Sequence, residues 1–173
     1  MESRLRTAGV LSGVVCLLAW AAMVAATFLP FVGFPLYDGL QVGSQPPPQA
    51  TGNLLQGYDA RWVVATLIVL GVAAAGNLAG YGHRVTAAGS LMASAAALVL
   101  ALLEGSDSGW RVLPGNWGAA GIPDAPTDVT LGAGYHVFLV GAVVALAASL
   151  IMVAAVLSRP RLRAEAPTPA SIP

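Results

Sequence analysis

Four long apolar stretches separated by polar segments dominate this 173-residue chain. They cover residues 8–29, 62–82, 85–103 and 134–157, and none of them contains Asp, Glu, Lys or Arg. A helix needs about 20 residues to cross roughly 30 Å of hydrocarbon. Unpaired backbone groups are costly in lipid and no alternating strand pattern is present, so only helices fit. The pattern predicts an all-α membrane protein with four transmembrane helices and two long external loops.

Composition supports lipid as the solvent of these stretches. Hydrophobic residues make up 57% of the chain and charged residues 9%, whereas soluble domains are about 25% charged. The formal net charge is zero, so a basic face for a nucleic-acid partner is not expected. The single cysteine, Cys16, excludes a disulfide within the chain and is predicted to be a small buried hydrophobe.

Arginine placement predicts the orientation of the four spans, because basic residues favour the cytoplasmic side. One side of the membrane receives the tail 1–7, the turn 83–84 and the tail 158–173. These segments carry most of the basic residues, namely Arg4, Arg6, Arg84, Arg159, Arg161 and Arg163. The other side carries Arg61 and Arg111. We therefore expect a multi-pass plasma-membrane protein with both termini in the cytoplasm and a disordered C-terminal tail.

The two external segments, 30–61 and 104–133, are rich in Gly, Pro, Asn and Asp. Loops of this length commonly carry function. Trp110, Arg111 and Trp117 are the predicted partner contacts in the second segment, because Trp and Arg dominate binding hot spots. A recognition surface is therefore expected outside the membrane.

The apolar stretches also carry small residues at helical spacing, which let helix backbones approach closely in lipid. The predicted packing residues are Gly9, Gly13, Gly76, Gly80, Gly89, Ala93, Ala97, Ala101, Gly141 and Ala145, with Ser149 in line with the last two. The stripe on the third stretch should face a neighbouring helix, and its opposite side, with Leu98 and Leu102, should face lipid. Asn77 is expected to form a hydrogen bond between helices.

Candidate chemistry is sparse along the chain. Glu104 and His136 fall at outer helix ends and His83 at the inner side, where ordinary solvation is expected. His83 and His136 lie on opposite sides, so they are not expected to share a metal ion. Aromatic residues beside the outer boundary, including Phe28, Phe31, Trp62, Tyr135 and Phe138, are predicted to form an interfacial belt. No catalytic residue, metal or cofactor is predicted.

Three short motifs carry a family resemblance: Phe-Leu-Pro-Phe at 28–31, Tyr-Asp-Gly at 37–39 and Gly-Ala-Gly-Tyr at 132–135. With them the chain resembles small four-helix integral membrane proteins that are common in actinobacteria. The use of Arg for all eight basic residues is typical of GC-rich coding and points to the same source. Those proteins are largely without assigned function, so the resemblance implies a topology and no site residues.

Three functions fit these observations. The first is a non-catalytic accessory or scaffold subunit that binds a membrane-protein partner or a second copy of the chain. The alternatives are a permease component for an apolar or neutral solute, which would need a polar-lined cavity, and a membrane-embedded enzyme, which would need a convergent polar cluster. The close-packing stripes, the long external segments and the sparse chemistry favour the first.

Overall fold

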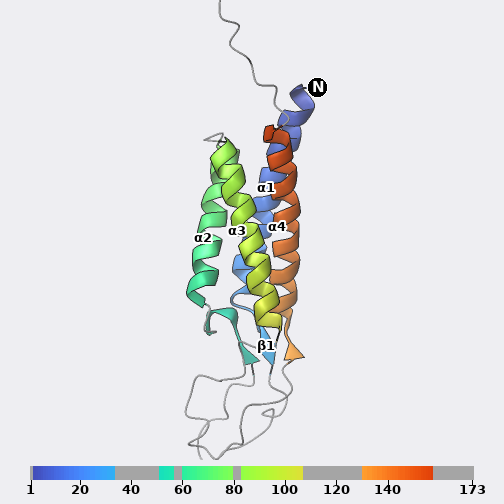
Figure 1. The fold of residues 1–173 in the computed structure, drawn as a ribbon. Coiled ribbons are helices and arrows are strands. Elements are labelled where there is room, and N and C mark those ends of the chain that lie inside the picture. Colours follow the sequence, from blue (N-terminus) through green and yellow to red (C-terminus); the bar gives the residue numbers. More distant parts are fainter. Residues whose placement is uncertain (1, 34–50, 57–59, 80–82, 107–129, 158–173) are drawn as a thin grey trace, which may run out of the picture.

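The computed structural model describes residues 2–33, 51–56, 60–79, 83–106 and 130–157. In this part of the chain, helices α1 (Glu2–Ala26), α2 (Ala60–Leu78), α3 (His83–Gly105) and α4 (Ala133–Leu157) form an elongated bundle (Figure 1). A short 3-10 helix, η2 (Leu54–Gln56), precedes α2. The predicted helical fold is thus confirmed, with each helix close to its predicted stretch.

The first helix differs most from its predicted bounds. It begins at Glu2 rather than at residue 8, and it ends at Ala26 rather than at residue 29. At its end, the Phe28 amide donates a hydrogen bond to the Ala25 carbonyl, and the Leu29 amide donates one to the Ala26 carbonyl. These are the hydrogen bonds of a 3-10 turn. Pro30 follows directly, and a proline disfavours helical geometry at the residue before it.

The helices pack as a ring in chain order, α1 against α2, α2 against α3, α3 against α4 and α4 against α1. Consecutive helices run in opposite directions (Figure 1). The start of α1, the end of α4 and the facing ends of α2 and α3 therefore lie at one end of the bundle, and the strands lie at the other. We call the strand-bearing end the sheet end.

In α1 and α3 the buried residues include a seam in which the spacing alternates between three and four positions. In α3 the seam is Ala87, Ser90, Ser94, Ala97, Ala101 and Glu104. In α1 it is Ser12, Cys16, Ala19, Met23 and Ala26. This spacing is that of helices packed at a shallow angle in antiparallel bundles. Because most seam residues are small, the helix backbones lie close together.

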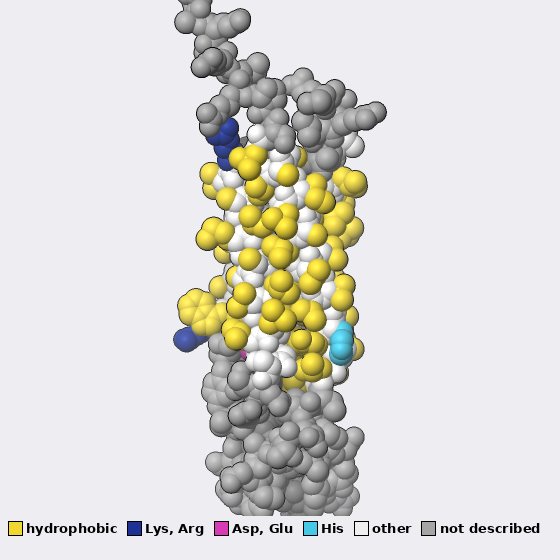
Figure 2. Space-filling view, turned by 45° about the vertical axis from the view of Figure 1, so that its right-hand side comes forward, with side chains coloured by type: hydrophobic (Ala, Val, Ile, Leu, Met, Phe, Trp, Pro, Cys, Tyr) yellow, Lys and Arg dark blue, Asp and Glu magenta, His cyan; other side chains and the backbone are white. Residues whose placement is uncertain are grey.

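Three of the helices are long and apolar enough to cross a membrane: Ala60–Leu78, Arg84–Gly105 and Ala133–Leu157. In α1 the described apolar part, Val10–Ala26, is shorter. Apolar side chains cover the visible face of the bundle over its whole length, and the charged side chains on that face lie near its ends (Figure 2). This surface suits lipid rather than water as its solvent.

A three-stranded antiparallel sheet closes the sheet end. It consists of β1 (Val32–Gly33), β2 (Thr51–Gly52) and β3 (Thr130–Leu131), in the order β2-β1-β3. These strands fall inside the segments 30–61 and 104–133, which were predicted as loops, so the described ends of these segments contain short strands. Strands of two residues are too short to show an alternating pattern in the sequence. Residues 34–50 and 57–59 of the first segment, residues 107–129 of the second and the tail 158–173 lie outside the described residues.

Candidate functional site

The sheet ties the bases of segments 30–61 and 104–133 to the bundle. The Phe31 amide donates to the Gly52 carbonyl at 2.7 Å, and the Gly132 amide donates to the Phe31 carbonyl at 2.8 Å. Val32 is therefore paired with Gly52 on one side and with Leu131 on the other. Residues far apart in the chain are joined within a few ångströms of the ends of α1 and α4. We call β1, β2, β3 and Phe31 the platform.

Two glycines make this join sterically feasible. A methyl group at position 132 would lie 2.3 Å from the Pro30 carbonyl oxygen, and one at position 134 would lie 2.9 Å from the Ala26 carbonyl oxygen. The Gly134 amide also donates to the Pro30 carbonyl at 2.8 Å. The Gly-Ala-Gly-Tyr motif thus corresponds to a close approach of two backbones, which only glycine permits.

An aromatic cluster anchors the platform to the bundle. Phe31 is fully buried, and its ring meets the rings of Tyr135 and Phe138 edge to face, with centroids 5.5 and 6.3 Å apart. The prediction that these three rings belong to an interfacial belt is wrong, because the fold turns them inward. Phe28 and Trp62 are 68% and 56% exposed, as belt residues would be. The Arg61 guanidinium lies 5.5 Å from the Trp62 ring centroid.

A second group of polar side chains lies inside the bundle and joins three helices. Cys16 of α1 lies 3.8 Å from the Ser149 hydroxyl of α4, measured from Sγ to Oγ, and the Ser149 hydroxyl lies 3.1 Å from that of Ser94 in α3. The Ser94 hydroxyl donates to the Ser90 carbonyl at 2.6 Å. We call Cys16, Ser149, Ser94 and Ser90 the interior chain; all four are fully buried.

The direction of the hydrogen bonds in the interior chain follows from counting protons. Ser94 has one hydroxyl proton, and a carbonyl oxygen only accepts. Because that proton goes to the Ser90 carbonyl, the Ser149 hydroxyl must donate to Ser94. The Ser149 proton is then used, so the Cys16 thiol must donate to Ser149. The protons of the Cys16 thiol and of the Ser149 and Ser94 hydroxyls each have an acceptor, so these groups connect α1, α4 and α3.

Asn77 extends the polar contacts from α2 to α3. Its Nδ2 donates to the Ser90 hydroxyl at 3.2 Å, and its Oδ1 accepts from the Thr86 hydroxyl. The prediction that Asn77 bonds across helices is confirmed. The sequence did not lead us to predict the hydrogen bonds of Ser90 and Ser94 between helices. Their spacing of four residues, in line with Ala97 and Ala101, was the available signal.

The predicted packing residues differ in burial and in how closely another helix approaches them. Ala93, Ala97, Ala101, Gly141 and Ala145 are buried. Methyl groups at positions 13, 76 and 141 would lie 2.9 Å from Leu78 Cδ2, 2.9 Å from Thr86 Cγ2 and 2.6 Å from Met23 Cγ. Gly89 is only half-buried, because steps of four residues drift by about 40° each around a helix with 3.6 residues per turn. Gly9 lies in α1, and Gly80 lies outside the described residues.

The other residues singled out in the sequence differ in how far they are buried. Glu104 was expected to be solvated but is only 4% exposed, because it continues the α3 seam three residues after Ala101. On the opposite side of α3, Leu102 is exposed and Leu98 is half-buried. His136 is exposed near the start of α4. Trp110, Arg111 and Trp117 lie outside the described residues. Among the residues that the structure describes, no group of three His, Cys, Asp or Glu side chains is placed to hold a metal ion.

Comparisons with models of protein families, with curated proteins and with solved structures find no match to this chain.

Proposed function

We propose that this protein is a non-catalytic accessory or scaffold subunit of a membrane complex. The observation that carries the proposal is the platform, whose strands fasten the bases of both external segments to one end of a tightly packed bundle. A partner surface held in this way loses less conformational entropy on binding than a free loop would. The partner is a membrane protein or a second copy of the chain.

Packing inside the bundle supports this role over a permease. Ala97, Ala142 and Ala145 face the bundle interior with no exposed surface, and the interior chain uses its polar groups to bond helices to one another. Close packing of this kind favours one rigid arrangement. A rigid bundle is what a platform requires.

The topology that we propose has all four helices crossing the plasma membrane, with both termini and residues 83–84 in the cytoplasm. Its support is the Arg distribution and the common position of the start of α1 and the end of α4 at one end of the bundle (Figure 1). Alkaline phosphatase fused after residue 50 should be active, and the same enzyme fused after residue 84 should be silent. The reverse pattern would sink the topology.

The accessory role is tested by mild-detergent purification of the tagged chain from its native membrane, followed by mass spectrometry. Gly132→Val should break the platform, because a side chain there meets the Pro30 carbonyl, and should lower partner recovery at least about tenfold. Gly89→Ala is the matched control, since its methyl group would lie 3.5 Å from Ala73 Cβ, an ordinary contact. Far-UV circular dichroism should show intact helices in both variants.

Trp110→Ala combined with Trp117→Ala should weaken the same complex without unfolding the helices, whose backbone bonds do not depend on these segments. A wild-type chain that is recovered alone at every detergent strength would overturn the accessory role and favour the permease alternative.

A further inference from the structure

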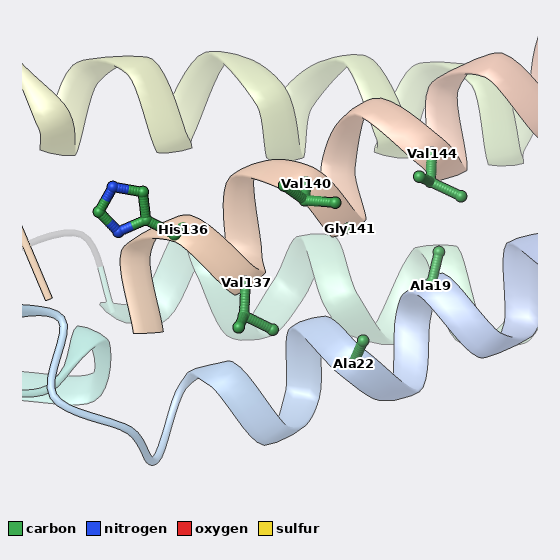
Figure 3. Close-up of a pocket in the computed structure, with 7 residues that line it drawn as sticks. All are labelled: Ala19, Ala22, His136, Val137, Val140, Gly141 and Val144. Atoms are coloured by element: carbon green, nitrogen blue, oxygen red, sulfur yellow. The ribbon is translucent and has the colours of Figure 1, made fainter. Parts of the chain in front are cut away.

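The surface between α1 and α4 is hollowed by a groove (Figure 3). Val137, Val140 and Val144 of α4 line it together with small residues of α1, and the ring of His136 points away from it. An apolar lining of this kind meets acyl chains, which all lipids of a bilayer share, so it does not distinguish one lipid from another. A preference for one class of lipid requires charged groups at an end of the bundle.

Positive charge gathers at the end of the bundle opposite the sheet end. This end comprises the start of α1, the facing ends of α2 and α3 and the end of α4 (Figure 1). We call it the basic end, because it brings together Arg4 and Arg6 of α1 with Arg84 of α3, three of the eight basic residues of the chain.

The sequence after α4 adds more positive charge. Three further arginines follow the end of that helix and lie outside the described residues, namely Arg159, Arg161 and Arg163. The acidic residues in the same segments of the sequence are Glu2 and Glu165. Arginines therefore outnumber acids at this end of the chain's path, which favours an anionic partner.

The first turns of α1 place two arginines at the depth of lipid headgroups. The helix begins at Glu2, whereas its apolar part begins at Val10. At about 1.5 Å per residue, the backbone of Arg6 lies roughly 6 Å before that part, and the backbone of Arg4 roughly 9 Å before it. The headgroup layer on each side of the hydrocarbon is roughly 5–8 Å thick. Both positions therefore fall within this layer or at its outer edge.

Arg84 lies at the corresponding level of a second helix. It is the first residue of Arg84–Gly105, the stretch of α3 that is long and apolar enough to cross a membrane, and its side chain is exposed. In the ring of helices α1 and α3 are separated by α2 on one side and by α4 on the other. Lipids around the bundle therefore meet cationic residues from more than one direction.

We propose that the basic end binds anionic phospholipids, and that Arg4, Arg6 and Arg84 supply the cations for their headgroup phosphates. A guanidinium stays charged and offers two parallel N–H donors to a phosphate. Anionic lipids are preferred over zwitterionic ones, because the ammonium group of a zwitterionic lipid offsets the charge of its phosphate. An acidic protein segment would approach from the water beyond the headgroups, whereas these three positions lie at headgroup depth.

This inference goes beyond the accessory role. It rests on the proposed topology, in which α1 crosses the membrane, and it does not involve the platform, which lies at the other end of the bundle.

Native mass spectrometry of the full chain in detergent tests the inference. The chain is offered equal amounts of phosphatidylglycerol and phosphatidylcholine with the same acyl chains. Phosphatidylglycerol should be retained at least about fivefold better, the ratio that corresponds to about 1 kcal/mol for one basic residue near a headgroup. Raising the ionic strength should weaken this preference, because salt screens exposed charges. Equal retention of the two lipids would overturn the inference.

Variants locate the preference on the three arginines. Replacing Arg4, Arg6 and Arg84 together by glutamine should lower the retention ratio at least about fivefold, whereas replacing them by lysine should keep the preference, because the charges remain. Since the removal of three arginines can alter membrane insertion, Arg84→Gln alone is the second variant and should lower the ratio by up to about fivefold. A ratio that neither glutamine variant lowers contradicts the inference.

Arg61→Gln is the matched control. Arg61 is also an exposed arginine in the first turn of a helix, but it lies at the sheet end, so this variant should leave the ratio unchanged. A ratio that falls as far in Arg61→Gln as in Arg84→Gln would show that any arginine near the membrane acts alike, and would refute a site at the basic end. So would a preference that disappears only when the arginines at 159, 161 and 163 are replaced.

The outcomes also separate this inference from the other proposals. Loss of the protein partner with an unchanged lipid preference in the triple glutamine variant would show that the basic end meets an acidic protein, and would overturn the inference. The phosphatase fusions test the topology independently. Lost lipid preference with unchanged partner recovery supports the lipid site and leaves the accessory role intact.

Discussion

The indole Nε1 of Trp20 in α1 donates a hydrogen bond to the backbone carbonyl oxygen of Leu67 in α2, across 2.7 Å. The ring lies against Gly71, where a methyl group would be 2.8 Å from the indole Nε1. The contact between α1 and α2 is the least extensive of the four in the ring of helices. This one aromatic residue therefore supplies a specific link where the bundle is otherwise least held together.

Enlarging Gly71 should break that link. We expect Gly71→Ala to lower the free energy of unfolding by about 1–3 kcal/mol, because the ring is held by its hydrogen bond and must shift in a packed site. Gly89→Ala should change it by less than about 0.5 kcal/mol, as its methyl group meets only an ordinary contact. Denaturant titration in detergent, followed by circular dichroism, measures both. Equal effects of the two variants would show that Trp20 moves freely.

Phe31 and Phe28 offer a matched pair at the sheet end. Phe31 is fully buried and Phe28 is 68% exposed. Phe31→Ala should cost about 3–5 kcal/mol in the free energy of unfolding, the usual cost of emptying a buried aromatic site, whereas Phe28→Ala should cost well under 1 kcal/mol. The same titration compares them. If the Phe28 variant proves the more damaging, membrane anchoring and not the aromatic cluster holds this end.

Ala97 lies on the buried seam of α3, and its neighbour Ala96 is exposed. Ala97→Leu adds volume where helix backbones meet and should destabilise the bundle by roughly 1–3 kcal/mol. Ala96→Leu adds the same atoms on the outer surface and should be tolerated. Steric-trapping or denaturant measurements in detergent distinguish the two. Tolerance of leucine at both positions would refute close packing of this face.

Ser149 takes part in two hydrogen bonds of the interior chain and Cys16 in one. Ser149→Ala should therefore lower the free energy of unfolding more than Cys16→Ala does. The scale is about 0.6 kcal/mol for each hydrogen bond between helices, reaching about 1.7 kcal/mol. Ser106→Ala, at an exposed position, is the control and should have little effect. The opposite ranking of Ser149 and Cys16 would contradict the assignment of two hydrogen bonds to Ser149 and one to Cys16.

The Cys16 thiol is fully buried among the helices. In detergent-solubilised protein it should resist N-ethylmaleimide and react only after denaturation, because alkylation needs an accessible thiolate. Ala21→Cys in a Cys16→Ala background places a thiol at an exposed position of α1 and should react without denaturation. Mass spectrometry counts the added groups. Rapid labelling of native Cys16 would mean that the bundle opens.

Much of the fold was predictable from the sequence. Stretches of about 20 residues without charge specify helices in lipid regardless of their neighbours, since each helix satisfies its own backbone bonds. That the amide of Asn77, placed within such a stretch, would need a hydrogen-bond partner could likewise be expected, because an unpaired polar group is costly in lipid. These properties depend on one segment and its solvent.

Properties that depend on two segments were decided by the tertiary structure alone. Glu104 was expected in water and is buried because the seam of α3 passes through it, and Phe31 was expected at the interface and is buried because β1 places it against Tyr135 and Phe138. The platform pairs residues from segments 30–61 and 104–133, and two-residue strands leave no periodic signal. Which helix each small residue meets depends on how the four described helices assemble. Local sequence does not contain that arrangement.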